Sequence, residues 1–260
     1  MRGQKRGSMT ELEKTLFIPL LVRANESKKN DALFYDAKAI QICEESTCDS
    51  KKYDGGTITS HGIIARTVYI DTVLLREIAQ NESVTIINIG CGLDTRPYRL
   101  TIPDHVTWYD VDLPDVIKLR REHLSEKANQ TFIEGSILED TWHASIVKKG
   151  KVVLIIEGVL VYFTKNEIET IFNILHTSFA GTLVIFDVLH SVFVGNGITS
   201  PFKWGISDIA DIDEEKLHIK ILDHKATGDL SKKRESLWFR MLDAVKVIKT
   251  RSQIIEALLT

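Results

Sequence analysis

The fold is decided by residues 84–95, which read VTIINIGCGLDT. Residues 84–89 form a short run of mostly β-branched side chains, which is typical of a buried strand. Gly90 and Gly92 follow at once, and a G-x-G turn lets the backbone reverse sharply and lets a ligand approach it closely. The stretch therefore predicts a strand that ends in a ligand-binding turn.

Downstream of this stretch, strand-like and helix-like segments alternate. Further strands are predicted at residues 106–109, 131–133, 151–156 and 182–187, and helices at 115–127 and 165–179. In the second of these helices, Thr164 as N-cap and Glu167 have the spacing of a capping box. Alternation of this kind is typical of right-handed βαβ units around a parallel sheet. We therefore expect an α/β fold with a Rossmann-like, doubly wound and mostly parallel sheet.

The segments outside this core have weaker patterns. Helices are expected at 11–24, 32–45 and 61–80, with a polar loop at 47–60. Beyond residue 190, a late strand is expected at 218–222 and a helix from Lys232 onward. The sequence does not place the last edge of the sheet.

Composition argues against several classes of protein. The chain has 260 residues, of which 43% are apolar and 27% charged, and these values are typical of a globular protein with an ordinary core. The net charge of −3 gives no general basic footprint, so we expect neither nucleic acid nor a membrane as a partner. Three cysteines without a Cys/His grouping at zinc spacing predict a cytoplasmic protein with reduced thiols and no metal site.

Several predicted strands end in residues that could bind a ligand. The first ends in the glycine loop, Asp110 and Asp112 follow the second, Glu157 follows the fourth, and Asp187 follows the fifth. Ligands of open parallel sheets bind at the carboxyl ends of the strands. Asp112 comes about 20 residues after the glycine loop, where a carboxylate can accept both hydroxyl hydrogens of a ribose.

This pattern has two main interpretations. One is a nicotinamide-dependent Rossmann oxidoreductase, whose fingerprint G-x-G-x-x-G has a glycine where this chain has Thr95. Asp94 also places a negative charge where a pyrophosphate would bind. The other is a methyltransferase, whose sulfonium cofactor has no phosphate and carries a positive charge that acidic residues favour. The residues favour the methyltransferase, and the oxidoreductase stays an alternative.

Three motifs resemble those of the leucine carboxyl methyltransferase family. They are NIGCGLDTRPYR at 88–99, WYDVDLPDVIKLRR at 108–121 and EGVLVYF at 157–163. Their order and spacing also match, and within the family the chain is similar to the bacterial branch that includes polyketide O-methyltransferases. The resemblance implies S-adenosyl-L-methionine as the cofactor. It also implies a class I methyltransferase fold for the core. Together with the order of the predicted helices and strands, this gives a helical N-terminal extension or lid at 1–80 and a class I methyltransferase core with C-terminal acceptor-side segments at 81–260.

The resemblance further implies a cofactor site. The loop from Gly90 to Asp94 would lie against the methionine moiety, Arg66 would hold its carboxylate, and Glu157 would lie near its ammonium group. Asp112 would hold the ribose hydroxyls. The full cofactor-binding set is Arg66, Gly90, Cys91, Gly92, Asp94, Asp112, Ser136, Ile137 and Glu157. Ser136 and Ile137 would flank the adenine, although eukaryotic members carry Asp at the first of these positions.

Some of these residues also have a purely structural interpretation. Asp112 could cap the helix that follows it, and Asp94 could pair with Arg96 or Arg99. Cys91 could be a small packing residue. Asp110 stands where the family often has Glu, and its shorter side chain argues against direct contact with the cofactor.

On the acceptor side, the resemblance implies Tyr162 as the candidate catalytic residue. We expect an O-methyltransferase that acts on a hydroxyl or carboxyl of a small molecule, which could be polyketide-like or aromatic. The alternatives are a carboxyl methyltransferase that acts on a protein C-terminus and a non-catalytic binding protein on the same scaffold. For an acceptor that needs a base, the sequence offers His61, His190 and His224.

Overall fold

The computed structural model describes residues 11–46, 56–195, 202–230 and 250–260. The chain forms two compact units, which are described separately below. The first comprises Met1–Ile64 and Leu93–Thr101, and the second comprises Ala65–Gly92 and Ile102–Thr260. The expected domain boundary after residue 80 stays a prediction.

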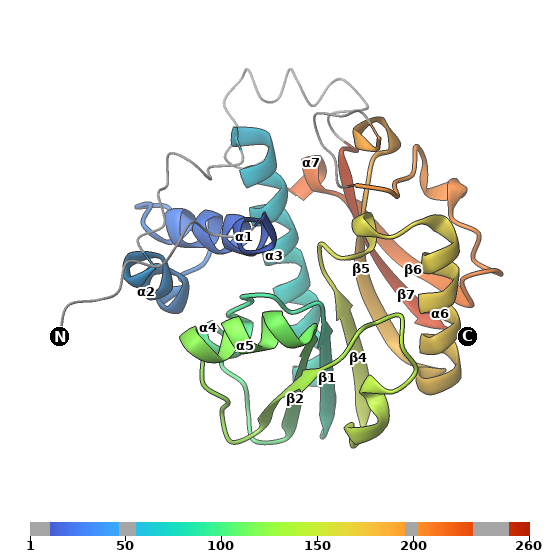
Figure 1. The fold of residues 1–260 in the computed structure, drawn as a ribbon, viewed down its shortest axis with the longest axis horizontal. Coiled ribbons are helices and arrows are strands. Elements are labelled where there is room, and N and C mark those ends of the chain that lie inside the picture. The colour runs from blue at the N-terminus through green and yellow to red at the C-terminus, as the bar shows by residue number, and fades with distance from the viewer. Residues whose placement is uncertain (1–10, 47–55, 196–201, 231–249) are drawn as a thin grey trace. The chain divides into compact units, whose positions relative to one another are not determined.

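The second unit is built on a seven-stranded mixed sheet with the order β3-β2-β1-β4-β5-β7-β6 (Figure 1). β1 to β5 run parallel to one another, whereas β7 runs antiparallel to both β5 and β6. The strands are β1 Val84–Ile89, β2 Val106–Asp112, β3 Gln130–Glu134, β4 Lys151–Ile156, β5 Leu183–Leu189, β6 Ile219–Ala226 and β7 Ser252–Leu259. The α/β fold with a mostly parallel, doubly wound sheet is therefore confirmed.

Helices pack on both faces of this sheet. On one face, residues 70–78 of α3 (Gly56–Gln80) contribute Ile70, Val73, Leu74 and Ile78 to a core with the strands. On the other face, α6 (Lys165–Phe179) presents a buried stripe that includes Phe172 and Leu175. α5 (Pro114–His123) connects β2 to β3, and two short helices, α7 (Thr227–Leu230) and η2 (Leu160–Tyr162), flank the later strands. Burial on both faces explains why β4 reads as an almost continuous apolar run and why β1 shows no alternation of apolar and polar residues.

The first unit is helical. It contains α1 (Glu11–Ser27), α2 (Ala37–Glu45), the beginning of α3, and the short helix α4 (Arg96–Arg99). Val22 of α1 packs with Ile63 and Ile64 of α3, and Phe34 lies against this cluster. α1 continues through Pro19.

Several expectations for individual elements are confirmed. β1 and β4 have the predicted bounds, and α6 begins with the capping box that Thr164 and Glu167 predict. Other boundaries differ. α2 begins at Ala37, because Asp36 rather than an earlier residue provides the N-cap. α3 begins at Gly56, inside the segment expected to be a loop, of which 47–55 lie outside the described residues.

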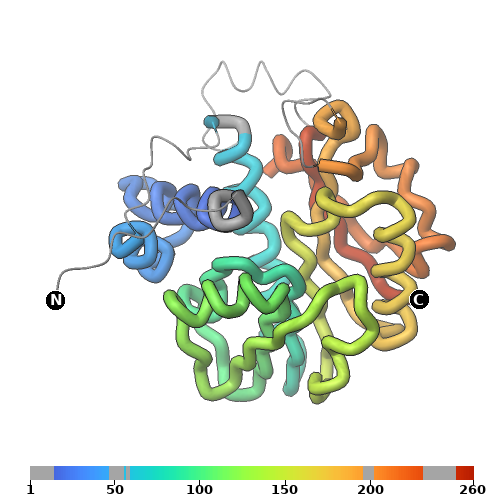
Figure 2. Tube along the Cα trace, in the orientation of Figure 1, coloured from blue at the N-terminus to red at the C-terminus, as the bar shows by residue number. Residues whose placement is uncertain are grey.

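The prediction of a helix from Lys232 onward is wrong for residues 252–259. Ser252–Leu259 forms β7, which is inserted between β5 and β6 (Figure 2), while residues 231–249 lie outside the described part of the chain. Leu258, Ala257 and Glu256 favour helices as individual residues, but pairing on both sides and burial between two neighbours override that preference. β6 is the edge strand on this side of the sheet and carries a register shift between Ile221 and Asp223.

Candidate functional site

The glycine loop after β1 lies where the strand order reverses. β2 and β3 lie on one side of β1, and β4 and β5 on the other, so the reversal falls between β1 and β4. Gly90 and Gly158, which follow these two strands, have φ of +67° and +69°. A Cβ atom at Gly90 would overlap the Val159 Cγ2 methyl group, so the two loops pack directly against each other. Such a reversal is the usual ligand site of an open parallel sheet.

The start of this loop is fixed to β2. The backbone N–H groups of Gly90 and Cys91 both donate to Val111 O, at 2.8 and 3.2 Å. The Cys91 side chain is buried, which agrees with a packing role. The glycine loop is thus a rigid backbone surface, and Cys91 is not positioned as an exposed nucleophile.

Asp112 lies at the end of β2, beside the glycine loop. Its Oδ2 accepts a hydrogen bond from Gly92 N at 2.8 Å, and its Oδ1 accepts one from Leu113 N at 2.8 Å. These bonds fix the carboxylate and leave acceptor capacity on each oxygen. Burial raises the pKa of Asp112 above its ordinary value, although the two backbone N–H groups act in the opposite direction. The N-cap of α5 is Leu113, so the structure does not support a capping role for Asp112.

Asp110 is fully buried and is bound by protein groups. Its carboxylate accepts hydrogen bonds from Arg120 Nη2 at 2.8 Å, Gln130 Nε2 at 2.6 Å, Trp108 Nε1 at 3.0 Å and Asn88 Nδ2 at 3.1 Å. Arg120 also donates through Nη1 to Gly92 O at 2.9 Å. Asp110 therefore holds Arg120, and Arg120 holds the glycine loop.

The side chains expected beside an adenine have different environments. Ser136 is half-buried, and its Oγ accepts a hydrogen bond from Leu138 N at 3.3 Å. Ile137 is buried in the core on the α6 side of the sheet, so its side chain presents little surface to a ligand. Leu113, by contrast, directly follows Asp112 and is 45% exposed. An apolar side chain at this place is a suitable neighbour for a flat aromatic ring.

Arg66 joins the ends of β4 and β5 through two ion pairs. Its Nε lies 2.7 Å from Glu157 Oε1, and its Nη1 lies 2.6 Å from Asp187 Oδ2. Asp187 Oδ1 also accepts a hydrogen bond from Gly158 N at 2.5 Å. Burial alone would lower the pKa of Arg66, but Asp187 and Glu157 raise it above its ordinary value. One guanidinium and two carboxylates give this mostly buried cluster a net charge of −1, which favours a cationic ligand.

Tyr162 lies in η2, after β4. Its ring is half-buried, and its centroid lies 5.6 Å from that of Phe202. Burial raises the pKa of the Tyr162 phenol above its ordinary value, with the charge of Arg66 acting against it. The phenol therefore stays protonated at neutral pH and is a hydrogen-bond donor rather than a base.

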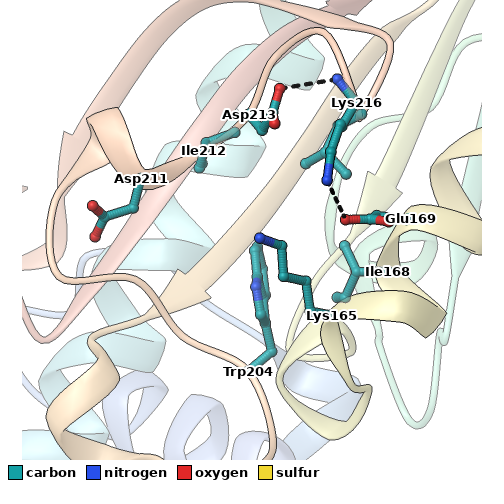
Figure 3. A pocket seen from close by; sticks show the side chains of 9 residues that line it. Lys165, Ile168, Glu169, Trp204, Asp211, Ile212, Asp213 and Lys216 are labelled. Carbon is teal, nitrogen blue, oxygen red and sulfur yellow. Dashed lines mark hydrogen bonds and ion pairs between the residues drawn. The ribbon is translucent and has the colours of Figure 1, made fainter.

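A small cavity lies between α6 and residues 211–217 (Figure 3). Trp204 and Ile168 line it, together with the ion pair between Lys216 and Glu169, whose Nζ and Oε1 are 3.7 Å apart. Its volume of about 30 Å³ is enough for a water molecule but not for an aromatic ring. Trp204 thus faces a separate small cavity on the α6 side.

Asp94 belongs to the first unit, whereas the other predicted site residues belong to the second. Its Oδ2 lies 2.7 Å from Arg96 Nη1, so the pairing weighed as an alternative is present. Burial alone would raise the pKa of Asp94, but Arg96, Arg23 and Arg99 hold it well below its ordinary value. The Asp94 charge is therefore neutralised within its own unit.

The three candidate bases have unrelated positions. His61 lines a cavity of about 220 Å³ in the first unit, between α1 and the beginning of α3. In the second unit, His190 accepts a hydrogen bond from Val192 N through Nδ1 at 3.2 Å, and His224 lies exposed on the edge strand β6. None of these observations selects a base. Among the described residues, no group of three or more His, Cys, Asp or Glu side chains is placed to hold a metal ion.

Three residues outside the predicted set belong to this site. Arg120 supports the glycine loop, Asp187 holds Arg66, and Leu113 is exposed beside Asp112. The position of Asp187 at a strand end is visible in the sequence, and so is the apolar residue between Asp112 and Pro114. Nothing in the local sequence indicates that Arg120, 28 residues from Gly92, reaches its carbonyl oxygen.

A family model described as leucine carboxyl methyltransferase matches residues 17–176, which is more than half of the chain. The chain belongs to this family. Its match to the family model includes the glycine loop, Asp112 and Glu157. The family resemblance that the three motifs carry is thereby confirmed.

Curated proteins similar to this chain include methyltransferases from a bacterium and a fungus. The tetracenomycin polyketide synthesis O-methyltransferase TcmP of Streptomyces glaucescens is 26% identical over 159 residues, which cover 61% of this chain and 59% of that protein. The S-adenosyl-L-methionine-dependent methyltransferase dpfgK of Gibberella zeae is 27% identical over 177 residues, which cover 62% and 59%. The matched part thus spans about three-fifths of the length of these relatives.

Solved structures support the fold of this family member. A DUF574 family protein from Streptomyces avermitilis has a TM-score of 0.56 at 12% identity and covers 93% of this chain and 97% of its own. The methyltransferase domain of bacterial CtHen1-C has a TM-score of 0.52 at 14% identity. The match covers 75% of this chain and 97% of that domain. In the part of the chain that the structure describes, no helix is both long and apolar enough to cross a bilayer.

Proposed function

We propose that this member of the leucine carboxyl methyltransferase family is an S-adenosylmethionine-dependent O-methyltransferase that acts on a hydroxyl or carboxyl group of a small molecule. The observation that carries the proposal is the set of groups at the carboxyl ends of β1, β2 and β4. The backbone of the glycine loop, the fixed carboxylate of Asp112 and the acidic cluster around Arg66 all follow the carboxyl ends of neighbouring parallel strands.

The residues present fit this cofactor. Asp112 offers a fixed carboxylate for the two ribose hydroxyls, and exposed Leu113 beside it offers an apolar surface for the adenine. The cluster of Arg66, Glu157 and Asp187 combines both signs of charge. Its net negative charge suits a sulfonium and an ammonium group, while Arg66 Nη2, which makes neither of the two ion pairs, is suited to a carboxylate.

The same cluster, rather than Asp94, argues against a dinucleotide. Because Asp94 pairs with Arg96, its charge gives little repulsion toward a pyrophosphate, and that part of the sequence argument is weaker than expected. The net negative charge of the Arg66 cluster, by contrast, would repel a phosphate group bound beside it. Thr95 still stands where a dinucleotide site requires a glycine, and its side chain is fully buried.

When bound, the cofactor supplies a methyl group that is already activated for transfer. The chain then has to bind and orient the acceptor oxygen in line with that group and to exclude water. Tyr162 is the group we assign to the acceptor side. Its protonated phenol is suited to donate a hydrogen bond that orients the acceptor oxygen, and the ring of Phe202 beside it gives an apolar wall.

The surface of the described residues supports a small acceptor rather than a protein tail. Among the described residues, Leu33 and Tyr35 lie in one segment between α1 and α2, and the other exposed large apolar side chains are far apart in the sequence; these are Leu75, Leu113, Val147, Val192 and Leu222. A specific protein partner usually requires about 800 Å² of surface on each side. The similarity to a polyketide O-methyltransferase also favours a small molecule.

The proposal is tested in two steps. Calorimetry on the purified protein should show binding of S-adenosylhomocysteine and no response to NAD, and the opposite pattern would refute the proposed cofactor. Labelled S-adenosylmethionine is then supplied with a panel of phenols and carboxylic acids and, separately, with folded proteins from the source cell. Label should appear on small molecules, whereas label on a protein C-terminus alone would establish the carboxyl methyltransferase alternative.

Replacing the Asp112 carboxylate should weaken cofactor binding. We expect Asp112→Ala to reduce the affinity for S-adenosylhomocysteine by about 1–3 kcal/mol, the usual effect of losing charge-assisted hydrogen bonds. Calorimetry at pH 7 measures the change. Asp115→Ala, in the exposed first turn of α5, is the matched control and should bind like the parent. Equal affinity of Asp112→Ala and the control would place the ribose elsewhere.

The same carboxylate predicts a pH dependence. Because the pKa of Asp112 is raised, the residue takes up a proton at a higher pH than an ordinary aspartate, and a protonated carboxyl accepts fewer hydrogen bonds. Affinity for S-adenosylhomocysteine should therefore fall as the pH decreases through this raised pKa. The measurement is a calorimetric series from neutral to acidic pH, beside Asp112→Asn. That variant should bind weakly with a flatter profile, and parallel profiles would show that another group titrates.

A further inference from the structure

Within the first unit, a single carboxylate oxygen connects α1 to the loop that continues the glycine turn. Asp36 Oδ2 accepts hydrogen bonds from Arg23 Nε of α1 at 3.2 Å and from Thr95 Oγ1 at 2.5 Å. Arg99 Nε of α4 lies 3.6 Å from the same oxygen. These partners are 13, 59 and 63 residues from Asp36 in the sequence. A contact between segments so far apart requires the folded arrangement of the unit.

The second carboxylate oxygen of Asp36 caps a helix. Asp36 Oδ1 accepts a hydrogen bond from Ala39 N at 2.9 Å and so forms the N-cap of α2. The Asp36 backbone N–H is in turn bound by Ser27 Oγ at 2.9 Å, at the end of α1. One side chain thus both starts α2 and holds the residues after the glycine turn.

Arg23 extends this connection to the glycine turn itself. Its Nη2 donates to Leu93 O at 2.9 Å, and Leu93 is the residue that directly follows Gly92. Within the second unit, Gly92 is held by Asp112 through its N–H and by Arg120 through its carbonyl group. The two residues joined by the Gly92–Leu93 peptide bond are therefore each held by side chains: Gly92 by Asp112 and Arg120, and Leu93 by Arg23.

The residues around Asp36 are buried, so these contacts restrict movement strongly. The exposed fractions are 0% for Asp36, 4% for Arg23 and 0% for Thr95. Water cannot replace a lost partner at such positions, and a buried donor or acceptor without a partner is costly. The loop is consequently held in one conformation as long as Asp36 keeps its partners.

From this geometry we infer that Asp36 is a positioning residue for the cofactor loop, acting through Thr95, Arg23 and Arg99. The inference rests on the proposed function, which places the loop from Gly90 to Asp94 against the cofactor. Asp36 does not touch the cofactor in this role. It fixes the residues that follow Gly92, so that the loop does not have to be ordered when the ligand binds.

The test uses Thr95→Val, which keeps the shape of the buried side chain and removes only the hydroxyl that binds Asp36. The charges of Asp36, Arg23 and Arg99 stay in place, so the variant is expected to fold. We expect its dissociation constant for S-adenosylhomocysteine to rise by about threefold to tenfold, as for one lost hydrogen bond. Amide hydrogen exchange should become faster at residues 93–101 and in α2.

Two further proteins separate the possible outcomes. Lys28→Gln removes an exposed ion pair with Glu44 in the same unit and should leave both affinity and exchange unchanged. If the parent protein binds no S-adenosylhomocysteine, the proposed function is wrong. If the parent binds it and Thr95→Val binds equally tightly with unchanged exchange at 93–101, the positioning role of Asp36 is wrong.

Asp36→Asn provides the second variant. Asparagine is as good an N-cap as aspartate, so α2 should still begin at the same residue while the charge that holds Arg23 is lost. We expect a larger loss of affinity than for Thr95→Val. A lower melting temperature with unchanged affinity in both variants would show a structural role only and would overturn the inference.

Discussion

Arg66→Met should destabilise the protein by about 3–5 kcal/mol, because removing one partner of a buried ion pair leaves an uncompensated charge. Here the loss would leave two carboxylates, Glu157 and Asp187, which are 11% and 4% exposed. Methionine retains most of the side-chain volume, so the effect reports the charge rather than a cavity. Urea denaturation at pH 7 measures the free energy of unfolding.

Two comparisons make this result specific. Arg121→Met removes an arginine that pairs with Glu126 at 3.1 Å but is 46% exposed, and this variant should change stability by no more than about 0.5 kcal/mol. Adding Glu157→Gln and Asp187→Asn to Arg66→Met neutralises the whole cluster and should recover much of the loss. If Arg66→Met and Arg121→Met were equally stable, the Arg66 cluster would not be buried in solution.

Gly90→Ala should lower the free energy of unfolding by about 2–4 kcal/mol. The loss combines the strain of a left-handed backbone with the steric overlap of the added methyl group. Gly90 has a φ of +67°, and a Cβ atom there would overlap the Val159 Cγ2 methyl group. Relief requires the β1 and β4 loops to separate, so affinity for S-adenosylhomocysteine should fall as well. Thermal unfolding with and without the ligand measures both effects.

Gly181→Ala is the matched control for this variant. Gly181 has a φ of +78°, and a Cβ atom there would meet no other atom within 4 Å. It should therefore show only the backbone cost of about 1–2 kcal/mol. Val159→Ala in the Gly90→Ala background removes the overlap and should bring the loss close to that of Gly181→Ala. No recovery in the double variant would mean that the two loops do not pack as described.

The parallel part of the fold could be predicted from the sequence because its signals are local. The β-branched run of β1, the apolar run of β4 and the capping box of α6 each span only a few residues. β7 could not be predicted in this way. Its sequence, SQIIEALL, contains residues that favour a helix, and its strand conformation comes from pairing with β5 and β6. The helix propensity of a segment is overridden where hydrogen bonding to strands distant in sequence determines its conformation.

The candidate site shows the same limit. The positions of Asp112 and Glu157 follow from the rule that ligands bind at strand ends, and the family motifs indicate Arg66. The ion pairs of Arg66 join residues 91 and 121 positions apart, so their geometry could not be read from spacing. Nor could the pairing of Asp94 be decided, since Arg96 and Arg99 are both within reach and the neighbouring Arg23 comes from a distant helix.

The insertion of β7 between β5 and β6 has a consequence for biosynthesis. A ribosome completes β5 about 60 residues before β7, yet β5 has no partner on that side until β7 exists. In the nascent chain, β5 therefore presents an apolar edge with unpaired N–H and C=O groups, the kind of surface that invites association with other chains. A polypeptide released before residue 252 would keep that edge open. We expect such truncated chains to depend on chaperones, whereas a chain that contains β7 covers this edge of β5.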